Sequence, residues 1–175
     1  MPQMSDIYQL ESLIEQTRQL AAEYKLTTGK PLPVTSEIAT HDAIKQLHLQ
    51  PVPLGTGGYD AIGTDGPRQG VRYQIKGRAI FDENRKGQRI GQLKIEQSWD
   101  AVLLVLLDET FHPVSIYEAT REEVEQALEQ ALKSRRTSRG AMSVARFKMI
   151  SRLVWSSDEG LIDDEIWFNH PESPV

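Results

Sequence analysis

The chain has 175 residues, of which 39% are hydrophobic and 26% are charged, and this composition is typical of one globular domain rather than a disordered chain. The absence of cysteine excludes disulfide bonds, thiolate metal sites and cysteine nucleophiles. The formal net charge is −5, so a nucleic-acid partner would have to bind a locally basic surface rather than a basic protein as a whole.

The first helix is expected from Ser5 to Leu26, where apolar residues recur at helical spacing. The apolar stripe consists of Ile7, Leu10, Ile14, Thr17, Ala21 and Tyr24. Such a stripe either docks on the rest of the domain or pairs with a second copy in a homodimer. We expect this helix and a linker to occupy residues 1–30, before the main domain at 31–157 and an acidic tail at 158–175.

A second helix is predicted from Thr35 or Ser36 to about Leu49, with one of the two hydroxyl side chains as its N-cap. Pro51 and Pro53 follow its expected end, since proline cannot continue a helix. This helix precedes the segment that carries the candidate chemistry.

A glycine-rich segment then leads to a short strand beside Asp60. Polar and apolar residues alternate from Val71 to Arg78, which predicts a second strand with Gln74 and Lys76 on one face. The turn-forming residues 64–70 between the two strands predict a hairpin.

The later elements complete a mixed sheet with helices on its faces. The apolar run from Ala101 to Leu107 is typical of a central strand buried on both faces, and Val114 to Tyr117 predicts another strand. Thr120 to Lys133 predicts a helix with Glu123 in a capping box, and Ser143 to about Trp155 predicts the last helix. This order indicates an α/β (α+β) fold.

The expected hairpin brings three polar side chains together, namely Asp60, Gln74 and Lys76. A hard cation such as Mg²⁺ prefers oxygen ligands, and one carboxylate with one amide oxygen can hold it while a phosphate completes the shell. The lysine can stabilise charge on that phosphate or activate a water molecule.

The segments GYD and YQIKGR resemble the motif of the PD-(D/E)XK, or restriction-endonuclease-like, nuclease superfamily. Asp60 matches the aspartate of the motif, Gln74 its acid position and Lys76 its lysine, while Glu37 matches an acid that many members place on the preceding helix. The resemblance covers about residues 35–132. It implies a mixed sheet flanked by helices, here with an extra N-terminal helix, and Mg²⁺ or Mn²⁺ held by Asp60, Gln74 and Glu37.

Two residues depart from the motif of this family. Tyr59 occupies the position at which the family motif has a proline before the aspartate, which is a mild change. Gln74 replaces the usual Glu or Asp, which removes a negative ligand and is expected to weaken metal binding.

Basic residues are concentrated in two stretches. The stretch from Gly66 to Lys94 contains eight Lys and Arg residues and two acids, and the stretch from Lys133 to Arg152 contains seven Lys and Arg residues and no acid. A local positive field of this kind favours phosphate contacts, although solvated surface charge is the alternative interpretation. The residues expected to contact DNA are Arg78, Arg135, Arg136, Arg139, Arg146 and Lys148.

The leading hypothesis is a bacterial-type cytoplasmic endonuclease without a membrane partner that hydrolyses DNA phosphodiester bonds with Mg²⁺ or Mn²⁺. Lys76 would stabilise charge or activate water, and Glu37 would be a supporting ligand or base. The alternative is a catalytically inactive module of the same fold that binds DNA or a partner protein. A third possibility is an unrelated α/β protein, in which Asp60 would not lie beside Gln74 and Lys76.

Overall fold

The computed structural model describes residues 4–81, 88–133 and 142–162. Its centre is a mixed seven-stranded sheet in the order β1-β2-β3-β5-β6-β8-β9, in which β3 and β5 are parallel and the other neighbours are antiparallel. The strands of this sheet are β1 (Leu49–Pro51), β2 (Ala61–Gly63), β3 (Arg72–Ala79), β5 (Ala101–Leu107), β6 (Pro113–Thr120), β8 (Arg152–Ser156) and β9 (Gly160–Leu161). The predicted α/β (α+β) class is confirmed.

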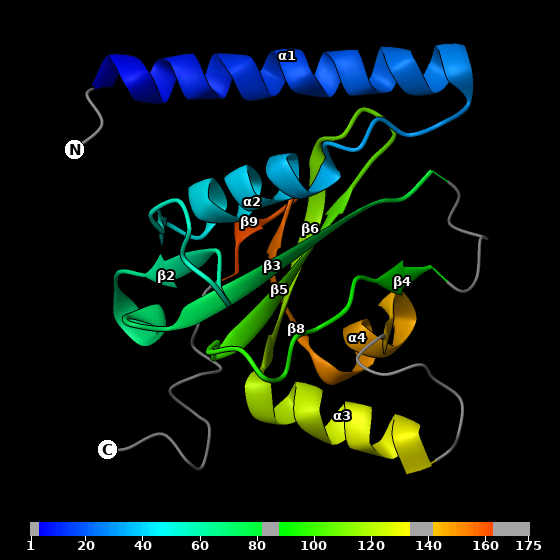
Figure 1. Cartoon of the computed structure of the whole chain (residues 1–175). Coiled ribbons are helices and arrows are strands. Elements are labelled where there is room, and N and C mark those ends of the chain that lie inside the picture. Colours follow the sequence, from blue (N-terminus) through cyan, green and yellow to red (C-terminus); the bar gives the residue numbers. More distant parts are fainter. Residues whose placement is uncertain (1–3, 82–87, 134–141, 163–175) are drawn as a thin grey trace.

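Helices cover both faces of this sheet (Figure 1). On one side lie α2 (Thr35–Gln46) and, beyond it, α1 (Met4–Thr28); on the other lie α3 (Arg121–Lys133) and α4 (Val144–Ile150). A short 3₁₀-helix, η1 (Gly66–Arg68), follows β2, and two further strands, β4 (Arg89–Ile90) and β7 (Met142–Ser143), pair with each other beside α4. No helix among the described residues is long and apolar enough to cross a membrane.

Strand β5 separates two hydrophobic cores. All of its side chains are buried, as expected for a central strand. Its odd-numbered residues pack into the core beneath α2, and its even-numbered residues pack into the core beneath α3 and α4. Burial of one aliphatic side chain stabilises a fold by roughly 1.5–3 kcal/mol, so β5 is a major contributor to stability.

Helix α2 sits very close to β3 because residue 77 is glycine. A Cβ atom on Gly77 would lie only 2.4 Å from the Cβ of Ala39 and 3.1 Å from the carbonyl oxygen of Thr35. This contact places the first turn of α2, which includes Glu37, on the Gly77 face of β3, opposite to the face that carries Lys76.

The second helix starts at Thr35, as predicted, but its predicted N-cap and its predicted end were wrong. Its N-cap is Val34, without a side-chain hydrogen bond, so neither expected hydroxyl group caps it. Helix α2 also ends at Gln46, because Leu49 leaves the helix and pairs with Gly63 in β1–β2. Pro51 is tolerated in β1 because this strand lies at the edge of the sheet.

The third helix begins as the sequence predicts. The Glu123 N–H donates to the Thr120 hydroxyl at 3.2 Å, and the Thr120 N–H donates to Glu123 Oε2 at 2.8 Å. Both hydrogen bonds of a capping box are therefore present, and they fix the start of α3 after β6.

The last predicted helix was too long. Helix α4 ends at Ile150, and Arg152–Ser156 forms β8, which pairs with β6 and buries Val154 and Trp155. Pairing and burial outweigh helical spacing in this apolar segment. Part of the expected acidic tail forms β9, and its remainder, residues 163–175, lies outside the described residues.

Helix α1 docks on the domain through only part of its apolar stripe. Ala21 is fully buried, and the buried Arg18 side chain pairs with Asp42 of α2 and donates to the Phe111 carbonyl oxygen. In contrast, Leu10 remains 51% exposed. The docking that the sequence allowed is present, and pairing with a second copy stays a prediction.

Candidate functional site

Asp60 stands immediately before β2, where β2 and β3 separate. Its N–H donates to the Tyr73 carbonyl at 2.7 Å, and its Oδ2 accepts the Ile75 N–H at 2.8 Å. The carboxylate thus satisfies a main-chain donor of β3 beyond the end of the β2–β3 pairing. The side chain is exposed, and its Oδ1 has no hydrogen-bond partner among the described residues.

Gln74 is a buried polar residue on β3, with 5% of its surface exposed. Its Nε2 donates to the Gly58 carbonyl at 3.1 Å, and this contact fixes the orientation of the amide because a carbonyl can only accept. The opposite atom, Oε1, is buried without a hydrogen-bond partner in the described part of the chain. An orphaned acceptor of this kind is where a cation or a water molecule would bind.

Lys76 lies on the same face of β3 as Gln74, as the strand alternation predicts. Burial lowers the pKa of the Lys76 ammonium below its ordinary value; the Asp60 carboxylate opposes this shift, and the charges of Arg78 and Lys94 add to it. The ammonium makes no hydrogen bond within the described ranges. It interacts with the charge of Asp60 without an ion pair at contact distance between these two described residues, and it remains available to a ligand.

Arg78 follows on the same face and is anchored by main-chain carbonyls. Its Nε donates to the Arg89 carbonyl at 2.6 Å, and its Nη1 donates to the Gly77 carbonyl at 2.5 Å. Burial lowers its pKa, although a guanidinium remains charged at neutral pH. Its Nη2 points to the side where Gly91 lies.

The segment from Gly91 to Trp99 forms a second wall of the site. It meets the glycine-rich loop at Gly58, where a Cβ atom would lie 3.2 Å from the Ser98 nitrogen. Arg121 donates to three main-chain carbonyls of this segment, and its guanidinium lies 4.6 Å from the centre of the Trp99 ring. Sequence reasoning missed this wall, because only the folded chain brings Arg121 beside it.

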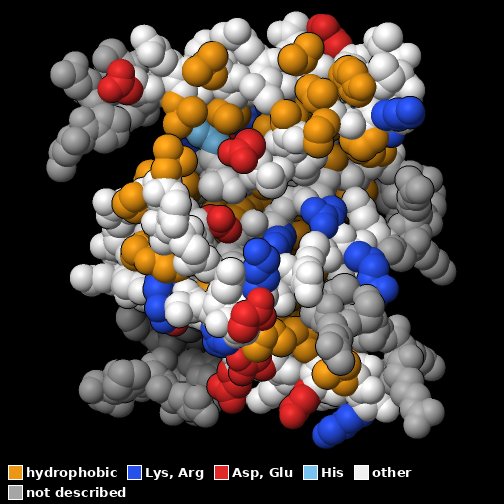
Figure 2. All heavy atoms as spheres, in the orientation of Figure 1, with side chains coloured by type: hydrophobic (Ala, Val, Ile, Leu, Met, Phe, Trp, Pro, Cys, Tyr) orange, Lys and Arg blue, Asp and Glu red, His pale blue; other side chains and the backbone are white. Residues whose placement is uncertain are grey.

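The structure brings four predicted site residues together, namely Asp60, Gln74, Lys76 and Arg78. Asp60 lies beside the strand that carries Gln74 and Lys76, as the predicted hairpin requires. Lys and Arg side chains also gather with acidic ones on the middle of the face shown in Figure 2, between the helices at its top and bottom.

The structure does not bring the other predicted residues into this group. Glu37 is exposed on α2, and the described residues contain no cluster of three acidic or histidine side chains that could hold a metal. On α4, Arg146 donates to Gln130 at 2.6 Å, and the Lys148 ammonium lies 5.5 Å from the centre of the Tyr117 ring. The expected DNA contacts Arg135, Arg136 and Arg139 lie outside the described residues.

A divalent cation fits this donor set only in part. Asp60 and Gln74 offer one free carboxylate oxygen and one free amide oxygen, which suit a hard cation. Asp65 does not add a second carboxylate here, because it lies beyond the other end of β2. Water and a phosphate would have to supply the remaining oxygens.

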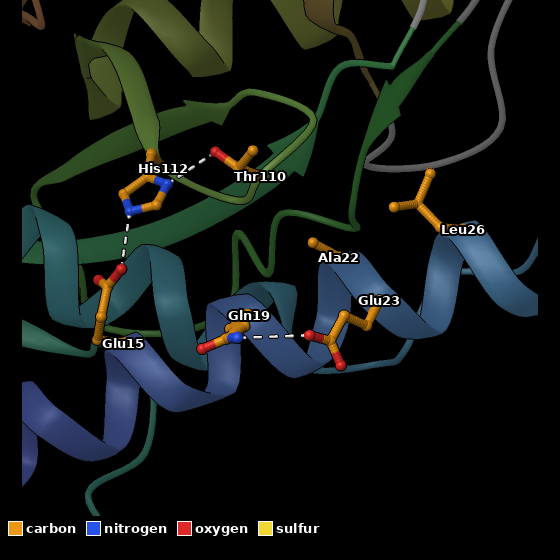
Figure 3. Close-up of a pocket in the computed structure, with 7 residues that line it drawn as sticks. All are labelled: Glu15, Gln19, Ala22, Glu23, Leu26, Thr110 and His112. Carbon is orange, nitrogen blue, oxygen red and sulfur yellow. Dashed lines mark hydrogen bonds and ion pairs between the residues drawn. The ribbon is translucent and has the colours of Figure 1, made fainter.

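A separate pocket lies beside α1, away from these residues (Figure 3). Its residues include His112, whose Nε2 lies 3.1 Å from Glu15 Oε1 and whose Nδ1 lies 2.7 Å from the Thr110 hydroxyl. The pocket volume of 270 Å³ is below the usual range for ligand pockets, and most of its lining side chains are exposed. We do not place the functional site there.

No protein-family model matches the chain, and no curated protein is significantly similar to it. The chemistry of the β2–β3 site is therefore the guide to function.

Proposed function

We propose that this protein is a divalent-metal-dependent endonuclease of the PD-(D/E)XK type that hydrolyses DNA phosphodiester bonds. The observation that supports this function most is the binding of the Asp60 carboxylate to β3 at Ile75, next in sequence to Lys76, whose charge it influences, with the orphaned oxygen of Gln74 on the same strand face as Lys76. A carboxylate and an unpaired oxygen acceptor can hold a metal ion, and a free ammonium can stabilise charge on a phosphate.

Asp60 Oδ1 and Gln74 Oε1 would hold Mg²⁺ or Mn²⁺, since neither atom has a hydrogen-bond partner among the described residues. When bound, such a cation polarises the phosphate and increases the acidity of a coordinated water molecule. Glu37 stays a proposed supporting ligand or base on the strength of the resemblance alone, because α2 packs on the Gly77 face of β3, opposite to the face of Lys76.

The residues of the chain orient these groups before the substrate arrives. The Ile75 N–H holds the Asp60 carboxylate in one orientation through its other oxygen. Lys76 donates to the phosphate and stabilises the negative charge that develops on it, and its partial burial strengthens that interaction. Fixed donors stabilise a transition state without having to reorganise first.

The second candidate function is a catalytically inactive module of the same fold that binds DNA. The specific observation in its favour is the hydrogen bond from Gln74 to the Gly58 carbonyl, which gives the amide a structural role. Such a module needs the basic residues but not the metal ligands.

A plasmid-nicking assay separates the two candidates. The protein is incubated with supercoiled DNA in Mn²⁺ and in Mg²⁺, beside Asp60→Asn, which retains an acceptor for the Ile75 N–H, and Lys76→Ala. Matched controls are Asp65→Asn and Lys45→Ala, since Lys45 pairs with Glu11 of α1, away from the site. We expect metal-dependent nicking that falls at least ~100-fold in the two site variants only.

Two other results would contradict the nuclease proposal. Nicking that persists in both site variants would come from a contaminant or another site. No nicking by the unmodified protein, together with salt-sensitive DNA binding that survives both substitutions, would support the binding module instead.

A further inference from the structure

Gly91 lies directly beside the cationic ends of two side chains of β3. A Cβ atom at residue 91 would lie 3.4 Å from Arg78 Nη2 and 3.9 Å from Lys76 Nζ. The φ angle of Gly91 lies outside the left-handed region, so its backbone conformation does not require glycine. The missing side chain instead leaves both cationic ends uncovered on this side.

Within the described ranges, Arg78 Nη2 and Lys76 Nζ have no hydrogen-bond partner. The printed sequence places no acid between Gly91 and Lys94, and Arg78 uses Nε and Nη1, but not Nη2, in its contacts with the described chain. Lys94 adds a third positive charge near Lys76, and Asp60 supplies the negative charge that acts on it. This local excess of positive charge is complementary to an anion.

The wall that contains Gly91 is fixed in position by its neighbours. Ile90 is 1% exposed and pairs with Met142, and Leu93 is 2% exposed in the same core. Gly91 therefore lies between two buried anchors, while the Arg78 guanidinium is held by the Arg89 carbonyl. A ligand would meet at least one donor, Arg78 Nη2, whose position is already set, which reduces the entropy cost of binding.

We propose that the space bounded by Gly91, Lys76 and Arg78, the Gly91 cradle, binds one phosphate group of a DNA strand. Arg78 Nη2 and Lys76 Nζ donate to non-bridging oxygens of this phosphate. Arg78 is then a substrate-binding residue, and Gly91 keeps the cradle open. The identification of the anion as DNA phosphate rests on the proposed function, whereas the binding needs neither metal nor cleavage.

The test measures binding of a labelled DNA duplex by fluorescence anisotropy in EDTA, over a series of salt concentrations, with inorganic phosphate as competitor. Gly91→Ala places a methyl group against both cationic ends at ordinary contact distances, and Arg78→Gln removes the Nη2 donor. Gly57→Ala, where no atom lies within 4 Å of the new Cβ, and Arg89→Gln, an exposed charge on β4, are matched controls.

We expect Gly91→Ala and Arg78→Gln each to weaken DNA binding roughly 10-fold, as for loss of a charge-assisted hydrogen bond. Arg78→Gln also reduces the slope of log affinity against log salt by about 1. Gly57→Ala binds like the unmodified protein, and Arg89→Gln loses much less affinity than Arg78→Gln. If Gly91→Ala unfolds, as circular dichroism would reveal, the comparison of Arg78→Gln with Arg89→Gln decides the question.

Three results would overturn the proposal. Both cradle variants could bind DNA as the unmodified protein does, or Arg89→Gln could lose as much affinity as Arg78→Gln. The third is that the unmodified protein shows no DNA binding that phosphate competes away. A plasmid-nicking assay on the same preparations distinguishes failure of the cradle proposal from failure of the nuclease proposal. Nicking without these affinity losses refutes the cradle alone, and the affinity losses without nicking in any metal support the cradle and refute the nuclease.

Discussion

Gln74 donates a hydrogen bond from its side-chain amide to the carbonyl of Gly58, 3.1 Å away. This contact gives a structural reason for an amide at the position where the PD-(D/E)XK motif has an acid. A carboxylate at residue 74 would turn an oxygen toward the Gly58 carbonyl oxygen, and two acceptors without a proton repel each other. The glycine-rich loop and the amide are therefore matched to each other.

The first prediction concerns Gln74→Glu. Without metal, this variant loses the hydrogen bond to Gly58 and is expected to be less stable than the unmodified protein by about 1–3 kcal/mol. Added Mn²⁺ is expected to restore much of the loss, because the new carboxylate is a stronger metal ligand. Chemical denaturation with and without metal measures both effects. Gln92→Glu, at an exposed residue, is the control, and a Gln74→Glu protein of unchanged stability in EDTA would contradict the prediction.

The second prediction concerns the buried ion pair between Arg18 of α1 and Asp42 of α2. Arg18→Met leaves the Asp42 carboxylate buried without its partner and is expected to lower the free energy of unfolding by about 3–5 kcal/mol. Lys45→Met breaks the exposed pair with Glu11 and is expected to cost less than about 1 kcal/mol. Urea denaturation measures both values. Equal effects of the two substitutions would mean that Arg18 does not hold α1 in place.

The third prediction is a pH dependence set by Asp100. Hydrogen bonds from the Arg72 guanidinium lower the pKa of Asp100, so its carboxylate is more acidic in the folded chain than in the unfolded chain. Its contribution to stability is present above the unfolded pKa of about 3.9 and is lost as the pH falls through the lower folded value.

Asp100→Asn should therefore lower the unfolding midpoint at pH 7, with a difference from the unmodified protein that shrinks below about pH 4. Thermal unfolding across this pH range measures the difference. Glu109→Gln, which neutralises an exposed acid, is the control. A difference that stayed constant with pH would show that the Asp100 charge does not stabilise the start of β3 and β5.

The fourth prediction concerns the close contact between α2 and β3. Gly77→Ala places a methyl carbon 2.4 Å from the Cβ of Ala39, so the helix must shift, and the expected loss of stability is about 1–3 kcal/mol. Gly57→Ala has no such neighbour and serves as the control. A second substitution, Ala39→Gly, should lower the free energy of unfolding less in the Gly77→Ala background than alone, because it removes the clash. Equal losses of stability from Ala39→Gly in both backgrounds would contradict a contact between residues 39 and 77.

The fold was predictable where a local pattern and the final environment agree. The continuous apolar run of β5 indicated burial on both faces, and the Thr120 capping box indicated the start of α3; both are confirmed. The prediction failed at Leu49 and at Arg152–Ser156, where pairing with a distant strand decides the structure. No periodicity within a short segment contains that information.

The candidate site was predictable for similar reasons. Asp60, Gln74 and Lys76 belong to one hairpin, so their proximity follows from local strand pairing. The positions of Gly91 and Arg121 depend on a long connection between parallel strands and were not predictable. Metal binding and catalysis stay predictions.

The charge balance at Gly91 has a consequence for the order in which ligands bind. The described site contributes one nearby carboxylate and three cationic side chains, so an isolated divalent cation meets net repulsion there. A bound phosphate would reduce that repulsion and add metal-ligating oxygens. Metal and DNA should therefore bind with positive coupling, in which each raises the affinity for the other by the same factor. Metal affinity measured without DNA would then understate the affinity in the presence of the substrate.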